Sequence, residues 1–236
     1  MGFEIEEAPT EEYSFKEYIL QPAILSNRIF SAIISSPKLK YWLLATIISS
    51  PFQALGSWLI MSKLLIEIRV SEELPAETLQ FMEGIVDLML RNPLIIFINS
   101  LIGELLVGVL SGIVIFLIAR LFAGKGSLSS GIALAGLNSL PSIVYGILLA
   151  LLGLSLPTTR WIIEVGPQMN FNTNVPWEIF LQESILQLVI SVWFLLVLLL
   201  SYIRGYGMTR MRAVIASLVT WFVSNIFLII GLLPYI

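Results

Sequence analysis

The sequence predicts an all-α protein with several helices that cross a membrane. Hydrophobic residues make up 57% of the 236 residues and charged residues 12%, whereas soluble domains contain about 25% charged residues. Apolar runs recur along the chain, and each is long enough for the roughly 20 helical residues that span a hydrocarbon core. The runs are continuous and lack the period-two alternation of outer-membrane strands, which favours helices over a barrel.

Five apolar runs predict a polytopic membrane protein with five transmembrane helices. They lie at about residues 41–61, 94–118, 131–154, 179–203 and 213–233. Residues 1–20 form an acidic segment before this single transmembrane domain, which covers residues 21–236. We expect no cleaved signal peptide, because residues 1–17 contain six Glu and one Lys where a basic segment and an apolar run are needed.

The positions of Lys and Arg predict the orientation of the helices. Nine of these residues lie before the first span or in the short turns that join spans two to three and four to five, and four lie on the other side. The positive-inside rule therefore places the N-terminus and both turns in the cytoplasm and residues 233–236 outside. The expected location is the cell membrane, in a multi-pass arrangement.

A first amphipathic stretch precedes the spans. Residues 24–34 carry apolar side chains at helical spacing, with polar side chains opposite, and Pro22 and Pro37 flank them. The pattern predicts an N-terminal amphipathic helix. Two interpretations stay open, because the helix can lie in the cytoplasmic membrane interface or pack its apolar face against the bundle.

Two segments between spans are predicted on the outer side. Residues 76–91 have the spacing of an amphipathic helix, which can pack on the bundle or lie flat on the membrane. Residues 155–178 contain Pro, Asn and Gly, together with Trp161 and Trp177. This composition predicts an irregular loop anchored at the membrane interface by its aromatic side chains.

Glu104 lies ten residues into the second apolar run. A charged carboxylate at such depth costs at least about 2.5 kcal/mol, so we expect it to face the bundle interior. It is either a proton or cation site or a structural carboxyl that hydrogen-bonds a polar residue. The candidate partners are Ser57, Asn99, Asn138, Gln187 and Asn225.

Small residues at four-residue spacing predict close helix packing. Gly108 and Gly112 form such a pair in the second span, and Gly131 with Ala135 and Gly146 with Ala150 repeat it in the third. Within lipid, close approach through small residues supplies the packing between helices. We therefore expect spans two and three to form the tightest hairpin, with a dimer interface as the alternative use of these residues.

The two turns predicted in the cytoplasm contain the candidate functional residues. In the first, Gly124 and Gly126 can adopt left-handed conformations and Ser127 can cap the next helix. The second turn has an Arg-Gly-Tyr-Gly sequence followed by two further arginines, at the height of anionic headgroups. Its arginines serve as positive-inside anchors or as a docking spot for lipid or protein. The basic residues of both turns are Arg120, Lys125, Arg204, Arg210 and Arg212.

The absence of Cys and His from the sequence excludes several classes of chemistry. Zinc fingers, disulfide frameworks, thiol nucleophiles and Ser-His-Asp triads all need these residues. We expect no catalytic residue, no metal site and no cofactor, and therefore no enzyme. A net charge of −3 also argues against nucleic acid as a partner.

The residues from Ile118 to Ser127, followed by 133–136 and Pro141, resemble the Yip1 domain of prokaryotic and archaeal membrane proteins. That domain shows Ala-Arg, two small or Gly positions and Lys-Gly-Ser, and then a Pro inside the next span. The five-span layout with an Arg-bearing turn before the last span is similar as well. The resemblance extends over about residues 20–235.

The resemblance implies a non-enzymatic protein that organises the membrane or acts as an adaptor. Eukaryotic relatives act in vesicle trafficking, associate with Rab GTPases and carry an Asp-Leu-Tyr-Gly-Pro motif. Only Glu17 to Pro22 stands loosely in its place here, so we do not expect a Rab-type partner. The expected partners are membrane lipids, with other membrane proteins or a second copy left open. The alternative function is a small proton- or cation-coupled transporter or channel that uses Glu104.

Overall fold

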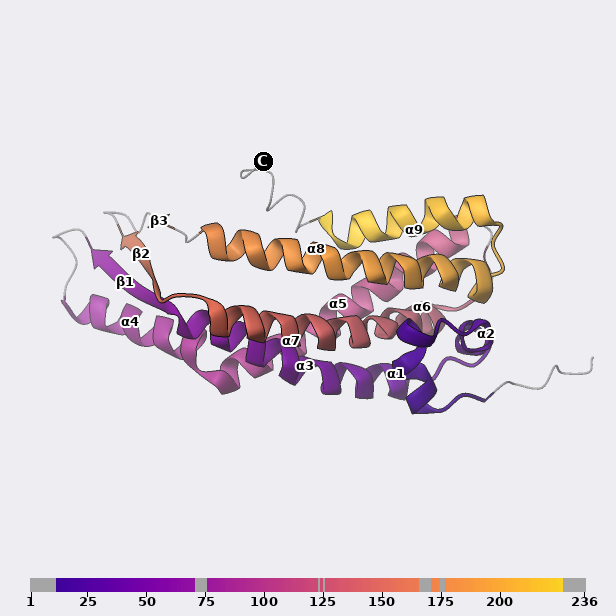
Figure 1. The fold of residues 1–236 in the computed structure, drawn as a ribbon, viewed down its shortest axis with the longest axis horizontal. Coiled ribbons are helices and arrows are strands. Elements are labelled where there is room, and N and C mark those ends of the chain that lie inside the picture. Colours follow the sequence, from indigo (N-terminus) through magenta and orange to yellow (C-terminus); the bar gives the residue numbers. More distant parts are fainter. Residues whose placement is uncertain are drawn as a thin grey trace, which may run out of the picture. The chain divides into compact units, whose positions relative to one another are not determined.

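The computed structural model describes residues 12–70, 76–122, 124, 126–165, 171–174 and 177–226. Most of these residues are helical (Figure 1). In chain order the elements are α1 (Phe15–Ile24), α2 (Asn27–Ser35), α3 (Leu39–Ser62), β1 (Leu64–Val70), α4 (Ala76–Arg91), α5 (Pro93–Leu121), α6 (Leu128–Ala135), the 3₁₀ turn η1 (Gly136–Asn138), α7 (Ser139–Ser155), β2 (Thr159–Val165), β3 (Phe171–Asn174), α8 (Trp177–Leu200), the π-helical turn η3 (Ser201–Gly205) and α9 (Arg210–Ser224).

Four helical segments are long and apolar enough to cross a membrane, and they coincide with the first four predicted spans. They are Leu39–Ser62, Pro93–Leu121, Leu128–Ser155 and Glu178–Gly205. The third comprises α6, η1 and α7, and the fourth joins α8 to η3. The chain is therefore a multi-pass protein by the length and hydropathy of its helices.

The predicted fifth span, residues 213–233, is described only in part. Helix α9 begins at Arg210 and has 15 residues, which corresponds to about 22 Å of helix. Residues 227–236, which include the chain end predicted outside, lie beyond the described part. A fifth crossing thus stays a prediction.

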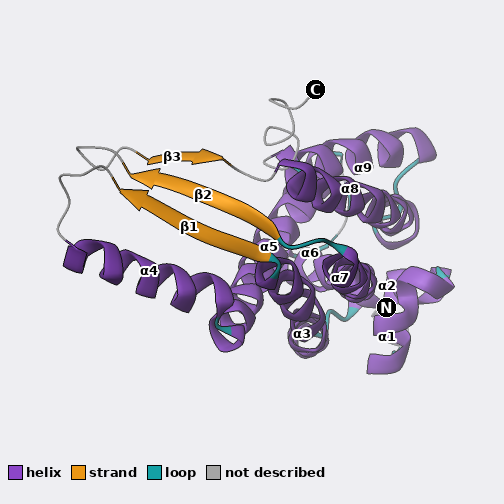
Figure 2. Cartoon of the chain, turned by 60° about the vertical axis from the view of Figure 1, so that its left-hand side comes forward, coloured by secondary structure: helices purple, strands orange, loops and turns teal. Residues whose placement is uncertain are grey.

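A three-stranded sheet corrects the all-α prediction (Figure 2). Strand β1 pairs with β2 in parallel, from Leu64↔Thr159 to Val70↔Val165, and β2 pairs with β3 antiparallel. The prediction of an irregular loop at residues 155–178 was wrong for the same reason. Short strands rich in Ile and Val look like the ends of neighbouring apolar helices, and their pairing partners are distant in sequence.

The sheet also constrains the topology. Strand β1 follows α3 and strand β2 follows α7, and the Thr159 N–H donates to the Lys63 carbonyl over 2.9 Å. Hydrocarbon cannot satisfy the backbone groups at a sheet edge. The sheet therefore lies outside the hydrocarbon, and α3 and α7 end on the same side of the membrane, as the charge distribution predicts.

The chain divides into two compact units. Unit 1 comprises Met1–Ile47, Glu104–Pro141 and Ile190–Ile236, and unit 2 comprises Ile48–Gly103 and Ser142–Val189. Each of the four long helical segments contributes residues to both units. All nine basic residues predicted in the cytoplasm belong to unit 1, and the other four, Lys63, Arg69, Arg91 and Arg160, belong to unit 2.

Helix α4 forms in unit 2 over the predicted residues, Ala76–Arg91. The Trp58 indole N–H donates to the Arg91 carbonyl over 3.2 Å, and the Arg91 guanidinium donates to the Leu64 carbonyl over 3.2 Å. These bonds fix the C-terminal end of α4 against α3 and β1. Trp161 lies on β2, where its ring contacts Phe180 edge-on, and the side chain of Trp177 lies outside the described part.

Glycines bring helices together in both units. In unit 1, a Cβ on Gly112 would lie 2.6 Å from the Ile132 Cα, and one on Gly131 would overlap the Gly112 carbonyl oxygen. This contact between α5 and α6 confirms that spans two and three pack closely. In unit 2, a Cβ on Gly56 would lie 2.8 Å from the Gly146 carbonyl oxygen, so spans one and three also approach closely, which the sequence analysis missed.

Candidate functional site

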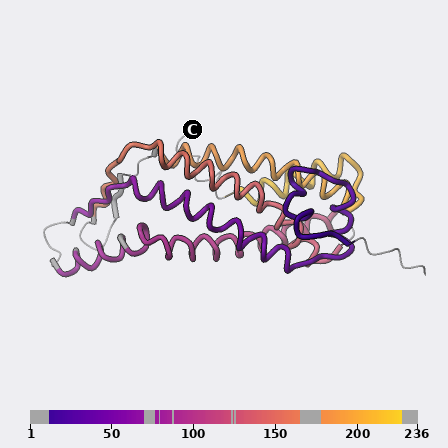
Figure 3. The backbone as a smooth tube through the Cα atoms, turned by 60° about the horizontal axis from the view of Figure 1, so that its bottom comes forward, coloured from indigo at the N-terminus to yellow at the C-terminus, as the bar shows by residue number. Residues whose placement is uncertain are grey.

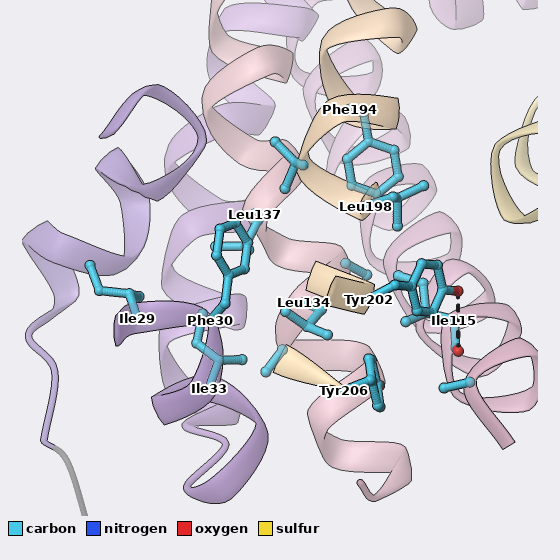
Figure 4. Packing of buried hydrophobic residues seen from close by; sticks show 14 of the residues in the cluster. Ile29, Phe30, Ile33, Ile115, Leu134, Leu137, Phe194, Leu198, Tyr202 and Tyr206 are labelled. Carbon is cyan, nitrogen blue, oxygen red and sulfur yellow. Dashed lines mark hydrogen bonds between the residues drawn. The ribbon is translucent and has the colours of Figure 1, made fainter. Parts of the chain in front are cut away.

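The candidate site is a group of three segments of unit 1, which we call the turn cluster. It comprises α2, the described residues of the α5–α6 turn (119–130) and the α8–α9 turn (201–210). These segments are distant in sequence, yet their buried side chains belong to one hydrophobic core (Figure 4). The structure thus brings together the two turns and the amphipathic stretch that the sequence analysis singled out.

The α5–α6 turn reverses the chain within a few residues. The Gly124 N–H donates to the Ala119 carbonyl over 2.7 Å. Gly126 has a φ of +142°, which residues other than glycine rarely adopt. Ser127 then caps α6 in a reciprocal pair of hydrogen bonds with Ser130. Lys125 lies outside the described residues.

The α8–α9 turn packs directly on these glycines. A Cβ on Gly124 would lie 2.9 Å from the Met208 Cε, and one on Gly126 would lie 2.7 Å from the Tyr206 Cε1. Tyr206 and Met208 are both buried. Glycine at 124 and 126 therefore leaves room for the second turn, a role that the sequence analysis did not assign.

The π-helical turn η3 positions Tyr202 and Tyr206. The Tyr206 N–H donates to the Ser201 carbonyl over 3.0 Å, and the two tyrosine rings lie 5.7 Å apart. The Tyr202 hydroxyl bonds to the Thr220 Oγ1 over 2.7 Å, which ties η3 to α9. Burial raises the pKa of Tyr206 well above its usual range, although Arg120 acts in the opposite direction.

Helix α2 packs on η3 and α6 through buried apolar side chains. The indigo trace of the N-terminal segment lies beside the turn from orange α8 to yellow α9 in Figure 3. Ile29, Phe30 and Ile33 are buried, and the Ser130 Oγ donates to the Ile34 carbonyl over 3.1 Å. A Cβ on Gly205 would lie 2.9 Å from the Ile34 Cγ1. These contacts favour the packing interpretation of this stretch, and a location in the membrane interface stays a prediction.

Helix α1 begins within the predicted acidic segment, residues 1–20, and ends four residues beyond it. Ser14 and Glu17 form a capping box at its start, and Tyr18 and Gln21 are fully buried. The Trp193 indole N–H donates to the Pro22 carbonyl over 2.9 Å. The Ser-x-x-Glu spacing was the signal that could have predicted this helix.

Pro141 lies in the first turn of α7, directly after η1. A proline is tolerated there because its missing N–H costs little at a helix start. The Ser139 hydroxyl donates to the Gly136 carbonyl over 2.6 Å, which supports the 3₁₀ geometry of η1. Pro141 is buried and has a structural place apart from the turn cluster.

The arginines of the turn cluster and of α9 are all exposed. Arg120 lies in the last turn of α5 with its guanidinium 5.4 Å from the centre of the Phe116 ring. Arg204 lies in η3, and Arg210 and Arg212 lie in the first turn of α9. The site therefore presents positive charge around a buried aromatic centre.

Glu104 lies on α5, away from the turn cluster in sequence. Its side chain is partly buried and its Oε1 atom is inaccessible to solvent, whereas Leu106 and Leu110 on another face of α5 are strongly exposed. This placement agrees with an inward-facing carboxyl. Its role as a proton site or a structural group stays a prediction.

Within the described ranges, no group of three or more carboxylates could hold a metal ion.

Comparison with known proteins shows which family the chain is related to. A family model described as the Yip1 domain matches residues 16–232. The chain belongs to the Yip1 family. No curated protein and no solved structure matches it. The Yip1 match includes α1 except for Phe15, both turns and the whole of α9, so the turn cluster is part of the family's domain.

Proposed function

We propose that this Yip1 protein is a non-enzymatic protein of the cell membrane that organises the membrane or recruits other components to it. The turn cluster is its docking surface and faces the cytoplasm. The observation that supports this function most is the packing of the Tyr206 and Met208 turn on Gly124 and Gly126. This packing brings the α5–α6 turn, which contains the motif that resembles the Yip1 domain, into contact with the arginine-bearing α8–α9 turn.

The distribution of charge supports the orientation. Unit 1 holds the nine basic residues on the predicted cytoplasmic side, and the sheet of unit 2 lies outside the hydrocarbon. A docking surface with several exposed cations can attract anionic partners over about 8 Å at physiological ionic strength. This Yip1 protein therefore presents most of its basic residues to the compartment where soluble partners are recruited.

Site-specific photo-crosslinking in native membranes tests the proposal. A crosslinking amino acid at Met211, which is 77% exposed, should give discrete adducts with other membrane or cytoplasmic components. The matched control is Phe81 on α4, which is 68% exposed in unit 2. The same adducts from both positions, or none from Met211, would contradict a docking role for the turn cluster.

A second candidate function is proton- or cation-coupled transport past Glu104. The buried Oε1 atom of this carboxyl, on a face of α5 away from Leu106, is the observation that favours it. Purified protein in proteoliposomes would then carry a flux that the Glu104→Gln variant abolishes. Equal leakage through wild type, variant and empty vesicles would leave recruitment as the function of this chain.

A further inference from the structure

We infer that Arg120, Arg204, Arg210 and Arg212 bind the phosphate of an anionic glycerophospholipid in the leaflet that they face. We call these four residues the arginine patch. The inference deepens the proposed function, because it names a lipid as the first partner of the turn cluster. Five features of the structure support it.

The two turns place the four arginines around one centre. At Gly124, four residues after Arg120, an added Cβ would lie 2.9 Å from the Met208 Cε, and at Gly126 it would lie 2.7 Å from the Tyr206 Cε1. Arg204 precedes Tyr206 by two residues, and α9 begins two residues after Met208. Each of the four arginines therefore lies within four residues, along the chain, of Gly124, Tyr206 or Met208, which pack together.

Within the part of the chain that the structure describes, no carboxylate pairs with the arginine patch. In the described ranges none of the four arginines forms an ion pair, whereas Arg69 bonds Glu67 over 3.0 Å in unit 2. The sequence has no Asp or Glu between Glu104 and Glu164, and none after Glu183. An external anion is the partner that this arrangement can accept.

Helix α9 adds to the positive potential. Its N-cap residue, Thr209, makes no side-chain capping bond, and Arg210 and Arg212 occupy its first turn. Cations are unfavourable at the positive end of the helix dipole, and a bound anion reverses that effect. Helix α6 is different, because Ser127 and Ser130 already cap its N-terminus.

A buried donor lies beside the patch. The Tyr206 hydroxyl is inaccessible to solvent and has no hydrogen-bond partner among the described residues. It lies close enough to Arg120 for the two groups to interact electrostatically. A buried hydroxyl without an acceptor is unfavourable, and a phosphate held by Arg120 would bring acceptor oxygens to this part of the cluster.

The surroundings of the patch favour a lipid over a free phosphate. Arg120 and Arg204 lie in the last turns of the apolar segments Pro93–Leu121 and Glu178–Gly205, at the height of headgroups. Large apolar side chains beside them are exposed, where the acyl chains of a bound lipid would lie. They are Leu117, Leu121, Met211, Val214 and Ile215.

Lipid binding to the full-length protein in neutral detergent tests the inference. Energy transfer from tryptophan to fluorescent phosphatidylglycerol is compared with transfer to phosphatidylcholine that carries the same label. We expect selective binding of phosphatidylglycerol, which weakens about fivefold for each Arg→Gln substitution in the patch and weakens with salt. Arg160→Gln, an exposed position on β2 in unit 2, should leave the selectivity unchanged.

Two further arms keep the result decisive. The Arg210→Lys/Arg212→Lys variant keeps the positive charge and with it the membrane topology, but lacks the bidentate fork of arginine. It should fold and lose part of the selectivity. Inorganic phosphate at the concentration of the lipid should not compete. Equal binding of both lipids by wild type, or full competition by phosphate, would overturn the inference, while adducts at Met211 would still support recruitment.

Discussion

The Tyr18 hydroxyl donates a hydrogen bond to the carbonyl oxygen of Ala133, 115 residues further along the chain. Both residues are buried, and the hydroxyl also lies against Gly136, where a Cβ would overlap it. Helix α1 thereby inserts a side chain at the point where α6 gives way to η1. The segment before the first span is thus an integral part of unit 1.

Replacing Tyr18 should loosen this attachment. Tyr18→Phe removes the hydroxyl donor to a buried carbonyl and should lower the free energy of unfolding by about 1–2 kcal/mol. Thermal unfolding in detergent measures the change. Tyr41→Phe is the matched control, because its hydroxyl makes no hydrogen bond to any residue that the structure describes and its ring is only partly buried, so a change within about 0.5 kcal/mol is expected. Equal effects of both variants would refute the role of the bond to Ala133.

A methyl group at the α5–α6 contact should separate the two helices. Gly131→Ala overlaps the Gly112 carbonyl and should cost about 1–3 kcal/mol of stability. Gly103→Ala on α5 has open space around it and should be neutral or stabilise the helix by up to about 1 kcal/mol. Comparing the two unfolding midpoints tests the packing, and a Gly131→Ala variant as stable as Gly103→Ala would contradict it.

The start of α1 should respond to acid. Hydrogen bonds from the Ser14 N–H and hydroxyl to the Glu17 carboxylate lower the pKa of Glu17 below its usual value. The cap therefore stabilises α1 above the pKa that Glu17 has in the unfolded chain, and this contribution is lost as pH falls through the lowered pKa. The protection of the amides of residues 15–18 against hydrogen exchange, relative to the intrinsic exchange rate at each pH, measures the fraying. In Ser14→Ala this protection should be lower at neutral pH and depend less on pH.

The orientation can be measured directly, because the sequence contains no Cys. Thr209→Cys, in the α8–α9 turn, should be protected from an impermeant thiol reagent in intact cells, whereas Thr158→Cys, next to β2, should react. Both positions are exposed, so permeabilised cells should label equally at each. Reversed labelling would place the turn cluster on the outer side and end the recruitment proposal.

The sequence analysis found the features that depend on local pattern. Hydropathy located four spans to within a few residues, and helical spacing predicted α4 over Ala76–Arg91. The small-residue spacing predicted the contact between Gly112 and Gly131. Each of these signals is contained in a window of one or two helices.

Features that depend on distant partners were missed. Strand β1 alternates apolar and charged residues from Ile66 to Val70, a strand signal that the sequence analysis did not use, but its partner β2 is about 90 residues away in the chain. The burial of Tyr18 depends on space that Gly136 leaves in another helix. For the turn cluster, the sequence analysis singled out the glycines and the basic residues of both turns, but it did not predict that the turns contact each other. Residues that pack together there, such as Gly126 and Tyr206, are far apart in the chain.

The parallel pairing of β1 with β2 sets an order for biosynthesis. Helices α4, α5, α6 and α7 must all leave the ribosome before β2 exists, and at about 5–20 residues per second this takes several seconds. During that time β1 has a bare edge that other nascent chains can join. Delayed synthesis or insertion of α7 should therefore expose this Yip1 protein to aggregation before its translation ends.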